Sequence, residues 1–346
     1  MRFGIFIPQG WRLDLVGIDP AQQWEAMNGL AQRADTGPWE SLWVYDHFHT
    51  VPVATQEATH DAWTLMSAFA ASTTRIRLGQ MCTCMGYRNP AYLAKVAATV
   101  DIISGGRAEM GIGGGWYEHE WRAYGYGFPE VRDRLAMLRE GVEIMHQAWT
   151  TGSATLDGKY YQVDGAIVQP QPLQATQPLQ ATQPLQATQP QQPAGIPFWI
   201  AGGGEKVTLK VAAKYASYTN FAGSIEEFDH KRSVLHEHCA ALGRDPGEIT
   251  QSSNINTIVG ATEAEAEERL RAVLDRLAPF VGGERRAGIE AEYRGSLGFG
   301  TPEQVAERLQ ERARHGLGYA IHYFPEAAYD TTGIELFETQ VVPALS

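Results

Sequence analysis

The sequence predicts an α/β fold, a (β/α)8 TIM barrel with insertions, for the whole chain, 1–346. Short apolar runs alternate with longer amphipathic segments, and this alternation occurs eight times. Alternating strands and helices form a parallel sheet with right-handed crossovers, and eight such units favour a closed barrel over an open sheet. The length of 346 residues also suits a barrel, which often exceeds about 250 residues when it carries insertions. We therefore expect a single domain.

The first four strand–helix units lie in the N-terminal part of the chain. The predicted strands are RFGIFIP (2–8), SLWVYDH (41–47), IRLGQMCTC (76–84) and RAEMGIG (107–113). The predicted helices cover 20–35, 60–73, the segment from 90 to SGG at 104–106, and roughly 130–149. Asp19 and Asn89 are predicted N-caps, because each stands directly before a proline at the first helical position.

The other four units follow after a long interruption. The predicted strands are PFWIAGGG (197–204), YTNF (218–221), SSNINTIVG (252–260) and GYAIHYFP (318–325). The predicted helices begin near 205, cover 225–242, begin with TEAEAEERL at 262, and cover 331–342. Most of these units have no antiparallel strand between them, which is the pattern of a parallel barrel.

Residues 154–196 form the interruption, and we interpret them as an insertion. The segment 154–170 is typical of a β-hairpin with the turn DGK. Three copies of the hexad PLQATQ follow at 172–190. A proline every six residues, without any charge, predicts neither a stable helix nor a central strand. We expect a flexible or polyproline-II-like surface loop, and a ligand for a proline-binding partner is the alternative.

Composition and charge narrow the classes of partner and location. The net charge is −12 and no Lys/Arg-rich run occurs, so we expect neither nucleic acid nor an anionic membrane as the main partner. The N-terminal apolar run is too short for a signal peptide, and no stretch approaches the roughly 20 apolar residues of a membrane span. Of the three cysteines, Cys82 and Cys84 would share one strand face and cannot link distant segments, which favours a cytoplasmic location.

Active sites of TIM barrels lie at the carboxyl ends of the strands. The residues at these ends are Gln9, Gly10, Trp11, Asp46, His47, Thr83, Cys84, Met85, Gly113, Gly114, Gly115, Gly202, Gly203, Gly204, Phe221, His322, Tyr323 and Phe324. Few of them are charged, and glycines and aromatic residues dominate. An aromatic, glycine-rich mouth with one Asp–His pair suits a flat organic cofactor and a small-molecule substrate.

Two glycine clusters require separate interpretations. The glycines at 202–204 lie between a strand and a helix, where free N–H groups favour a phosphate, and Lys206 and Lys210 could add positive charge. Val207 breaks the G-x-G-x-x-G pattern, so a tight βα turn is the alternative. The cluster MGIGGGWYEHEW (110–121) has Trp116 where a third glycine would stand. It predicts either close approach of the backbone to a ring system or a flexible loop entrance.

The spacing of His47 and His49 in DHFH (46–49) could bind a metal. Metal-dependent hydrolases with this barrel need further ligands on later strand ends. Those ends offer glycines, Phe221 and one histidine, His322. We therefore predict no metal site, with a metal-dependent hydrolase as a rejected alternative.

Four stretches together resemble the luciferase-like monooxygenase superfamily, in its branch that depends on the deazaflavin coenzyme F420. They are WVYDHF (43–48), YRNPAYLAKVAATVDIISGGR (87–107), GIGGGWYEHEWRAYGYGFP (111–129) and IAGGGEKVTLKVAAKYA (200–216). The resemblance runs over nearly the whole chain. It implies a luciferase-like TIM barrel, often a homodimer, with a flavin-like ring in the barrel mouth and its phosphate near the loop after the fifth strand.

The resemblance also implies roles for individual residues. Asp46 and His47 match an Asp–His pair that lies against the deazaflavin, in which the histidine is the acid/base group. Three further segments match cofactor contacts: a strand end with a non-prolyl cis peptide behind the ring, a backbone contact, and the phosphate loop. Their residues are Thr83, Cys84, Met85, Gly114, Gly115, Gly202, Gly203 and Gly204. We expect the cis bond at Thr83–Cys84.

One departure from the family bears on the substrate. The family's sugar-phosphate dehydrogenase has a glutamate where this chain has Trp116, and Glu118 and Glu120 are out of register. We therefore expect hydride transfer between coenzyme F420 and another small organic substrate, such as an alcohol, an aldehyde or an activated double bond. The alternatives are an FMN-dependent monooxygenase that uses O2 and, in a different class, a non-catalytic barrel that binds a ligand or serves as a scaffold.

Overall fold

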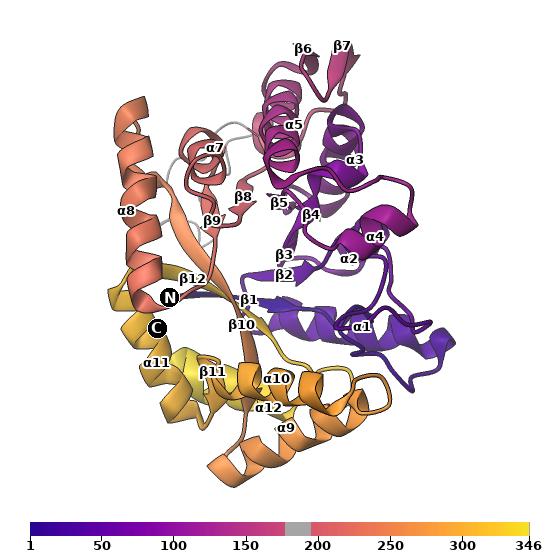
Figure 1. Ribbon diagram of the computed structural model, residues 1–346, viewed down its shortest axis with the longest axis vertical. Coiled ribbons are helices and arrows are strands. Elements are labelled where there is room, and N and C mark those ends of the chain that lie inside the picture. Colours follow the sequence, from indigo (N-terminus) through magenta and orange to yellow (C-terminus); the bar gives the residue numbers. More distant parts are fainter. Residues whose placement is uncertain (177–194, 346) are drawn as a thin grey trace. The chain divides into compact units, whose positions relative to one another are not determined.

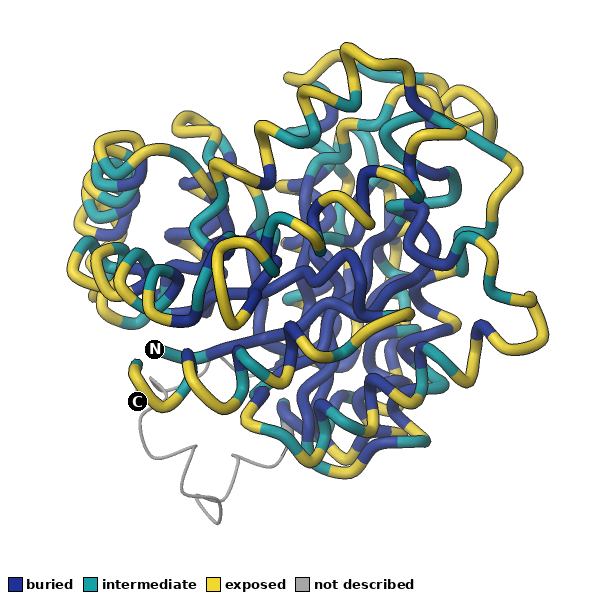
Figure 2. The backbone as a smooth tube through the Cα atoms, turned by 90° about the horizontal axis from the view of Figure 1, so that it is seen from below, coloured by how far each residue is buried: buried dark blue, intermediate teal, exposed yellow. Residues whose placement is uncertain are grey.

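The computed structural model describes residues 1–176 and 195–345, and its elements are labelled in Figure 1. The chain forms two compact units. The first contains Met1–Ala62 and Ser252–Ser346, and the second contains Trp63–Gln251. In both units the strands of the parallel sheet are largely buried while the outer sides of the helices are exposed (Figure 2). No helix in the described part of the chain is long and apolar enough to cross a membrane.

The sheet of the first unit is built from strands that are distant in sequence. Its strands are β1 (Arg2–Phe6), β2 (Ser41–Val44), β10 (Thr250–Val259), β11 (Gly298–Gly300) and β12 (Leu317–Tyr323). They are hydrogen-bonded in the order β2-β1-β12-β10, and β11 pairs with β10. The pairs β1–β2, β1–β12 and β10–β11 are parallel. Parallel pairing places the carboxyl ends of β1, β2 and β12 along one edge.

The first unit contains helices of very different lengths, and the sequence predicted the N-cap of the first one. They are α1 (Pro20–Thr36), α9 (Glu263–Leu277), α10 (Gly283–Arg294), α11 (Pro302–Arg314), α12 (Thr332–Leu336), a π-helical turn (Phe337–Val341) and α13 (Val342–Ala344). Asp19 caps α1, because its side chain accepts a hydrogen bond from Ala21 N. The elements α10, α11 and β11 were not predicted from the sequence.

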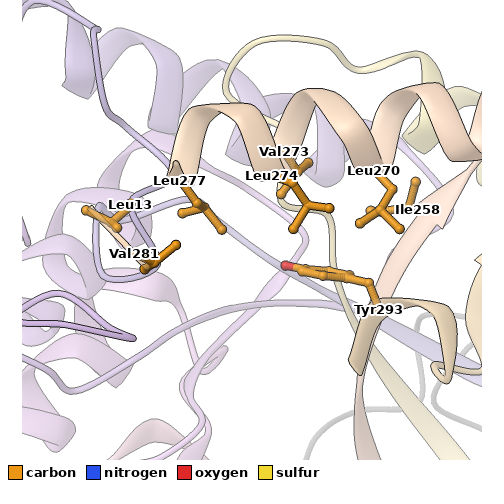
Figure 3. Packing of buried hydrophobic residues seen from close by; sticks show 8 residues of the cluster. All are labelled: Leu13, Ile258, Leu270, Val273, Leu274, Leu277, Val281 and Tyr293. Carbon is orange, nitrogen blue, oxygen red and sulfur yellow. The ribbon is translucent and has the colours of Figure 1, made fainter. Parts of the chain in front are cut away.

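A hydrophobic cluster holds α9 against the sheet of the first unit (Figure 3). Leu270, Val273, Leu274 and Leu277 recur at the spacing of one helical face, so they form a single apolar stripe. This stripe packs with Leu13, Ile258, Val281 and Tyr293. The Tyr293 ring lies beneath α9, so the unpredicted helix α10 contributes to the core.

The second unit contains a further run of parallel strands. Its strands are β3 (Arg77–Gln80), β4 (Thr83–Cys84), β5 (Met110–Gly113), β8 (Phe198–Ala201) and β9 (Tyr218–Asn220). The order is β9-β8-β5-β4, and all these pairs are parallel. An isolated bridge from Leu78 to Ala108 places β3 beside the residues that lead into β5. A separate antiparallel hairpin, β6 (Ser153–Asp157) and β7 (Gln162–Ile167), forms in the segment predicted to contain one.

The helices of the second unit surround these strands. They are α2 (Ala62–Ser72), α3 (Pro90–Ser104), α4 (Glu118–Ala123), α5 (Val131–Thr151), α6 (Leu173–Thr176), α7 (Thr208–Tyr215) and α8 (Ile225–Leu242), with short 3-10 turns at Met85–Tyr87 and Pro246–Glu248. Asn89 caps α3 through Ala91 N and Tyr92 N, as predicted. The helix ends at Gly105, whose φ of 70° is a left-handed conformation that glycine adopts easily.

Three sequence-based expectations are wrong in the second unit. The predicted strand 76–84 is divided into β3 and β4, and the non-proline cis bond joins Met81 to Cys82 rather than Thr83 to Cys84. Thr83 and Cys84 are instead extended, because they pair with Ile112 and Gly113 of β5. The first hexad copy was expected to be non-helical, yet Leu173–Thr176 forms the helical turn α6. The remainder of the hexads, 177–190, lies outside the described residues.

Candidate active site

The first unit places Asp46 and His47 directly after β2. Asp46 is buried, with 1% of its surface exposed, and His47 is half-buried. The His47 ring stacks on Trp11, with 4.2 Å between ring centroids and 2° between the planes. Trp11 follows β1, which is the parallel neighbour of β2, so both side chains come from adjacent strand ends. The structure therefore fixes the plane of the predicted acid/base imidazole.

Gln9 secures the end of β2 from the neighbouring strand end. Its side-chain oxygen accepts from Tyr45 N at 2.7 Å, and its side-chain amide donates to Tyr45 O at 2.7 Å. The same amide nitrogen lies 2.7 Å from His60 O. Because both backbone groups of Tyr45 are held, the backbone that carries Asp46 and His47 has a defined position.

Arg12 is a candidate site residue that sequence reasoning missed. Its guanidinium lies 5.1 Å from the Trp11 ring, 5.6 Å from Tyr45 and 4.7 Å from Tyr323. Its Nη1 donates to Asn256 Oδ1 at 2.8 Å. Aromatic faces attract cations, so the rings hold this charge at the carboxyl ends of the strands. The sequence signal was its position immediately after Trp11, in the loop after the first strand.

Asp14 lies in the same loop and is also buried. Its two oxygens accept from Gly10 N at 2.7 Å and from the Tyr323 hydroxyl at 2.9 Å. Burial raises the pKa of Asp14, although these hydrogen bonds act in the opposite direction. Asp14 therefore connects the ends of β1 and β12 rather than presenting a free carboxylate.

In the second unit, three consecutive glycines begin at the end of β5 and pack closely against neighbouring side chains. We call Gly113, Gly114 and Gly115 the glycine floor. A Cβ atom on Gly113 would lie 2.8 Å from Cys82 Sγ, and one on Gly115 would lie 2.4 Å from Cys84 Sγ. Gly115 also has a φ of 78°. Any other residue at these two positions would displace the Cys82 or Cys84 sulfur atom, so close packing requires glycine there.

Met85 differs from the other predicted cofactor contacts. Its side chain is completely buried and packs against α5, where a Cβ on Gly141 would lie 2.1 Å from the Met85 sulfur. Its backbone oxygen accepts from the Tyr161 hydroxyl at 3.1 Å. The Met85 side chain is thus a core residue, whereas Thr83 and Cys84 lie beside the glycine floor.

Two buried hydrogen-bond donors of the second unit bear on whether the ring of a flavin-like cofactor fits here. Gln80 Nε2 and Trp121 Nε1 have no hydrogen-bond partner among the described residues. Gln80 Oε1 already accepts from Thr83 Oγ1 at 2.8 Å, and Trp121 Nε1 lies 3.0 Å from where a Gly115 Cβ would be. A buried donor without a partner costs about 1–3 kcal/mol, so both positions suit carbonyl or ring-nitrogen acceptors of a bound cofactor. Neither residue stands out in the sequence.

A buried carboxylate, Glu120, directly precedes Trp121 in α4. Glu120 has no exposed surface and accepts from the Tyr87 hydroxyl at 3.0 Å. The sequence comparison with the family pointed instead to Trp116, which is 59% exposed and stacks on Tyr117 with centroids 5.1 Å apart. Glu120 is therefore the carboxylate of α4 that is shielded from water, one residue before the Trp121 donor in the chain.

The loop after β8 has the properties of a phosphate site. Gly202 has a φ of 107° and donates to Asn220 O at 2.8 Å, and the loop leads into the first turn of α7. Lys231 of α8 lies against it, because a Cβ on Gly203 would be 2.8 Å from Lys231 Nζ. A glycine loop before a helix N-terminus and an ammonium group both favour a phosphate, although the N–H of Gly202 is already donated to Asn220 O. The sequence did not indicate Lys231, which supplies a cation at Gly203.

No cluster of three or more His, Cys, Asp or Glu side chains that could hold a metal ion occurs in the described ranges 1–176 and 195–345. The two parts of the predicted site belong to different units: Asp46 and His47 lie in the first, and the predicted cofactor segments from Thr83 to Gly204 lie in the second. Within the second unit, β4, β5 and β8 bring those segments to neighbouring strand ends.

Comparisons with known proteins identify a family and several relatives of this chain. The family model described as luciferase-like monooxygenase matches residues 1–320. The chain is 30% identical over 245 residues to an F420-dependent glucose-6-phosphate dehydrogenase of Kineococcus radiotolerans, which covers 70% of this chain and 66% of that protein. A second relative of that name, from Amycolatopsis mediterranei, is 32% identical and is matched over 54% of this chain and 48% of its own length. The chain therefore spans less than two thirds of either relative.

Solved structures share the fold over the full length of the chain. A monooxygenase, RslO1 of Streptomyces bottropensis, has a TM-score of 0.77 at 20% identity and covers 100% of both chains. An F420-dependent secondary alcohol dehydrogenase has a TM-score of 0.75 at 21% identity, covering 100% of this chain and 99% of the other. These likenesses confirm the predicted fold class, a barrel of the luciferase-like type.

Proposed function

Because the chain belongs to the luciferase-like monooxygenase family, we propose that it is an oxidoreductase that depends on coenzyme F420. Its sequence relatives include F420-dependent glucose-6-phosphate dehydrogenases, which supports this cofactor. The observation that carries the proposal is the pair of buried donors, Gln80 Nε2 and Trp121 Nε1, which have no hydrogen-bond partner among the described residues and which acceptor atoms of a flat heteroaromatic ring would satisfy.

The cofactor would be held by groups of the second unit. Gly114 and Gly115 would offer their backbone to the ring, and the loop Gly202–Gly204 with Lys231 would hold the phosphate. When bound, the deazaflavin supplies two-electron hydride chemistry. The protein's contribution is to hold the ring in one plane and to keep water away from it.

His47 would supply acid/base catalysis. An imidazole takes or gives a proton near neutral pH, which an alcohol or carbonyl substrate requires when it exchanges a hydride. The stacked Trp11 ring holds the imidazole plane, and Asp46 beside it would contact the cofactor or orient the imidazole. For the substrate we propose a small organic molecule such as an alcohol, an aldehyde or an activated double bond.

The test replaces His47 with alanine and follows the absorbance of the oxidised deazaflavin during turnover of a screened substrate. We expect kcat to fall about 10²- to 10⁴-fold, because general acid/base catalysis contributes that much. Binding of the cofactor, measured by fluorescence titration, should change little. His49→Ala is the matched control, since it removes the same ring two residues later. Unchanged turnover in His47→Ala would exclude the acid/base role.

The second candidate is an FMN-dependent monooxygenase that uses O2. This chain shares its fold over its whole length with monooxygenase RslO1, which favours this candidate. FMN and deazaflavin are similar in shape, so the same site could bind either cofactor. Titration of the same protein with both cofactors separates the two. Tighter binding of FMN together with O2 consumption would replace the F420 proposal.

The remaining parts of the proposal concern the whole protein. We propose one luciferase-like domain with an insertion at 154–196, since the family model matches residues 1–320 and the insertion contains a hairpin of its own. A homodimer follows from the resemblance to the family. A cytoplasmic location is supported by three free cysteines and no disulfide among the described residues.

A further inference from the structure

The guanidinium of Arg12 in the first unit is hydrogen-bonded at one nitrogen only. Its Nη1 donates to Asn256 Oδ1 at 2.8 Å. Its Nε is buried and has no hydrogen-bond partner, and no described residue accepts from Nη2 either. The N–H groups of Nε and Nη2 are parallel, and a carboxylate accepts from such a pair through both of its oxygens. The edge of Arg12 that suits a carboxylate is therefore the edge that the described residues leave unbonded.

Arg12 is also not neutralised by a carboxylate of the protein. Asn256 stands between it and Glu292, because Asn256 Nδ2 donates to Glu292 Oε1 at 2.7 Å. Both oxygens of Asp14, in the same loop, accept hydrogen bonds from other groups. Within the described ranges Arg12 forms no ion pair, although it is half-buried. A partly desolvated charge of this kind is costly, and a bound anion would offset the cost.

Trp11 connects Arg12 to the proposed acid/base group. Its ring stacks on His47 with centroids 4.2 Å apart, and the Arg12 guanidinium lies 5.1 Å from the Trp11 ring. Trp11 is only 5% exposed, and its Nε1 is another buried donor without a hydrogen-bond partner among the residues described. Two consecutive residues therefore have donors that acceptor oxygens of a ligand near His47 would satisfy.

We propose that the substrate is a small hydroxycarboxylic acid, or the corresponding oxo acid, whose carboxylate binds to the Nε–Nη2 edge of Arg12. This proposal rests on the proposed function, in which His47 is the acid/base group. In the oxidative direction the hydroxyl-bearing carbon loses its hydrogen as a hydride to the deazaflavin, its C–O bond becomes a double bond, and the hydroxyl proton passes to His47. A carboxylate matches one planar guanidinium edge in shape and charge, whereas a phosphate monoester carries a second charge near neutral pH.

The experiment measures binding of a series of hydroxy acids of increasing chain length to the full-length protein by titration calorimetry. Each acid is compared with its methyl ester, which lacks the charge, and with the phosphate monoester of the corresponding diol. We expect at least one acid to bind about tenfold or more tightly than both counterparts, because hydrogen bonds to charged groups contribute that much. If esters or phosphates bind as tightly as the acids throughout the series, the proposal is wrong.

The titrations are made without cofactor and with oxidised F420. The measurement without cofactor requires no hydride transfer, so a wrong cofactor assignment leaves the preference for acids intact. Loss of turnover together with an intact preference would therefore contradict the proposed function and not the role of Arg12.

Variants of Arg12 test the residue itself. Arg12→Gln should reduce the preference for acid over ester about 10- to 100-fold while ester binding stays unchanged. Arg12→Lys keeps the charge but lacks the planar pair of donors, so it should retain part of the preference and raise KM more than it lowers kcat. The control is Arg286→Gln, which removes a cation of the first unit that pairs with Asp275 at 2.7 Å.

A preference that is unchanged in Arg12→Gln, or reduced equally in Arg286→Gln, would overturn the proposal. Misfolding of Arg12→Gln would abolish binding of ester and acid alike, and Arg12→Lys then decides. The full wild-type preference in Arg12→Lys would exclude binding through the paired donors of the guanidinium.

Discussion

His322 is completely buried inside an aromatic cluster of the first unit. Its ring lies 4.3 Å from Phe337 and 5.9 Å from Phe3, measured between centroids, and its Nδ1 is 2.8 Å from Thr257 Oγ1. Burial lowers the pKa of His322 to about 3, because the charged form would lose its water. This histidine is therefore neutral in the folded protein at any pH where the protein is handled.

The buried imidazole makes folding sensitive to acid. The unfolded chain binds a proton at His322 below a pKa of about 6.5, whereas the folded chain does not until about 3. The stability is therefore fully present above pH 6.5 and is lost as the pH falls toward 3. We predict that His322→Asn reduces this loss by about 2 kcal/mol between pH 6.5 and 4.5.

The measurement is urea unfolding of both proteins at several pH values. The smaller asparagine side chain loses packing energy, but that loss is the same at each pH. Only the pH dependence of the free energy of unfolding therefore measures proton binding by His322. Equal slopes in wild type and His322→Asn would show that the imidazole takes up its proton at the same pH in the folded and unfolded states.

Single residues of the site differ in how far the sequence revealed them. Asp46 and His47 were predictable, because two polar residues end an apolar run and match a family motif. Arg12, Gln80 and Lys231 were not, since their relevance depends on what lies beside them in space. Gln80 is a polar residue at the end of an apolar run, but only its unsatisfied side-chain amide marks it as a candidate site residue. Lys231 becomes a candidate only because it lies against Gly203.

At the scale of elements, α6 is held by tertiary contacts rather than by its own sequence. Gln174 donates to Asp101 Oδ1 at 2.7 Å and to Ala108 O at 2.8 Å, and it accepts from Arg77 Nη2 at 2.7 Å. All four residues are buried. This network offsets the poor helix propensity of a proline-rich hexad and attaches the start of the hexads to α3 and β3.

Removing the Gln174 amide should destabilise the second unit. Burial raises the pKa of Asp101, and the Gln174 amide acts in the opposite direction, so Gln174→Ala deprives a buried carboxylate of a donor. We predict a loss of about 1–3 kcal/mol in the free energy of unfolding, measured by urea titration. Gln162→Ala, which truncates an exposed glutamine of β7, is the control and should cost less than about 0.5 kcal/mol. A loss no larger than the control's would mean that α6 is not anchored by this side chain.

The helices that the sequence predicted correctly have recognisable capping residues at their ends. The boundaries of α8 agree with the prediction at both ends, and its first turn has a capping box from Ser224 and Glu227. The helix α10 was missed because Tyr293 is its one buried residue, so it has no apolar stripe. The strand β11 has three residues, two of them glycine, and becomes a strand only through pairing with β10.

At the scale of the whole molecule, a second buried group opposes the effect of His322 on stability. Glu326 follows β12 and is buried, and neither carboxylate oxygen has a hydrogen-bond partner in the described part of the chain. Burial raises the pKa of Glu326 to about 7, against smaller opposing contributions from Arg269 and Arg276. The folded protein therefore keeps a proton on Glu326 that the unfolded chain releases above a pKa of about 4.5.

The sign of the Glu326 contribution is the reverse of that of His322. Stability from Glu326 is fully present below pH 4.5 and is lost as the pH rises through about 7. Between pH 4.5 and 6.5 each group changes the free energy of unfolding by about 2 kcal/mol in opposite directions. The wild-type protein should therefore show little net dependence on these two groups in that window.

This cancellation predicts a pattern across three variants, measured as the free energy of unfolding from pH 4.5 to 8. Glu326→Gln keeps the shape of the side chain without its charge, so its stability should exceed that of wild type by about 3 kcal/mol at pH 8 and match it near pH 4.5. Relative to wild type between pH 4.5 and 6.5, Glu326→Gln should gain stability with rising pH and His322→Asn should lose it. The double variant should run parallel to wild type, because the two effects cancel and every other titrating group is common to all of them. If the changes in pH dependence of the two single variants do not add in the double variant, His322 and Glu326 titrate as a coupled pair. If the free energy of unfolding of Glu326→Gln runs parallel to that of wild type, Glu326 is ionised in the folded protein.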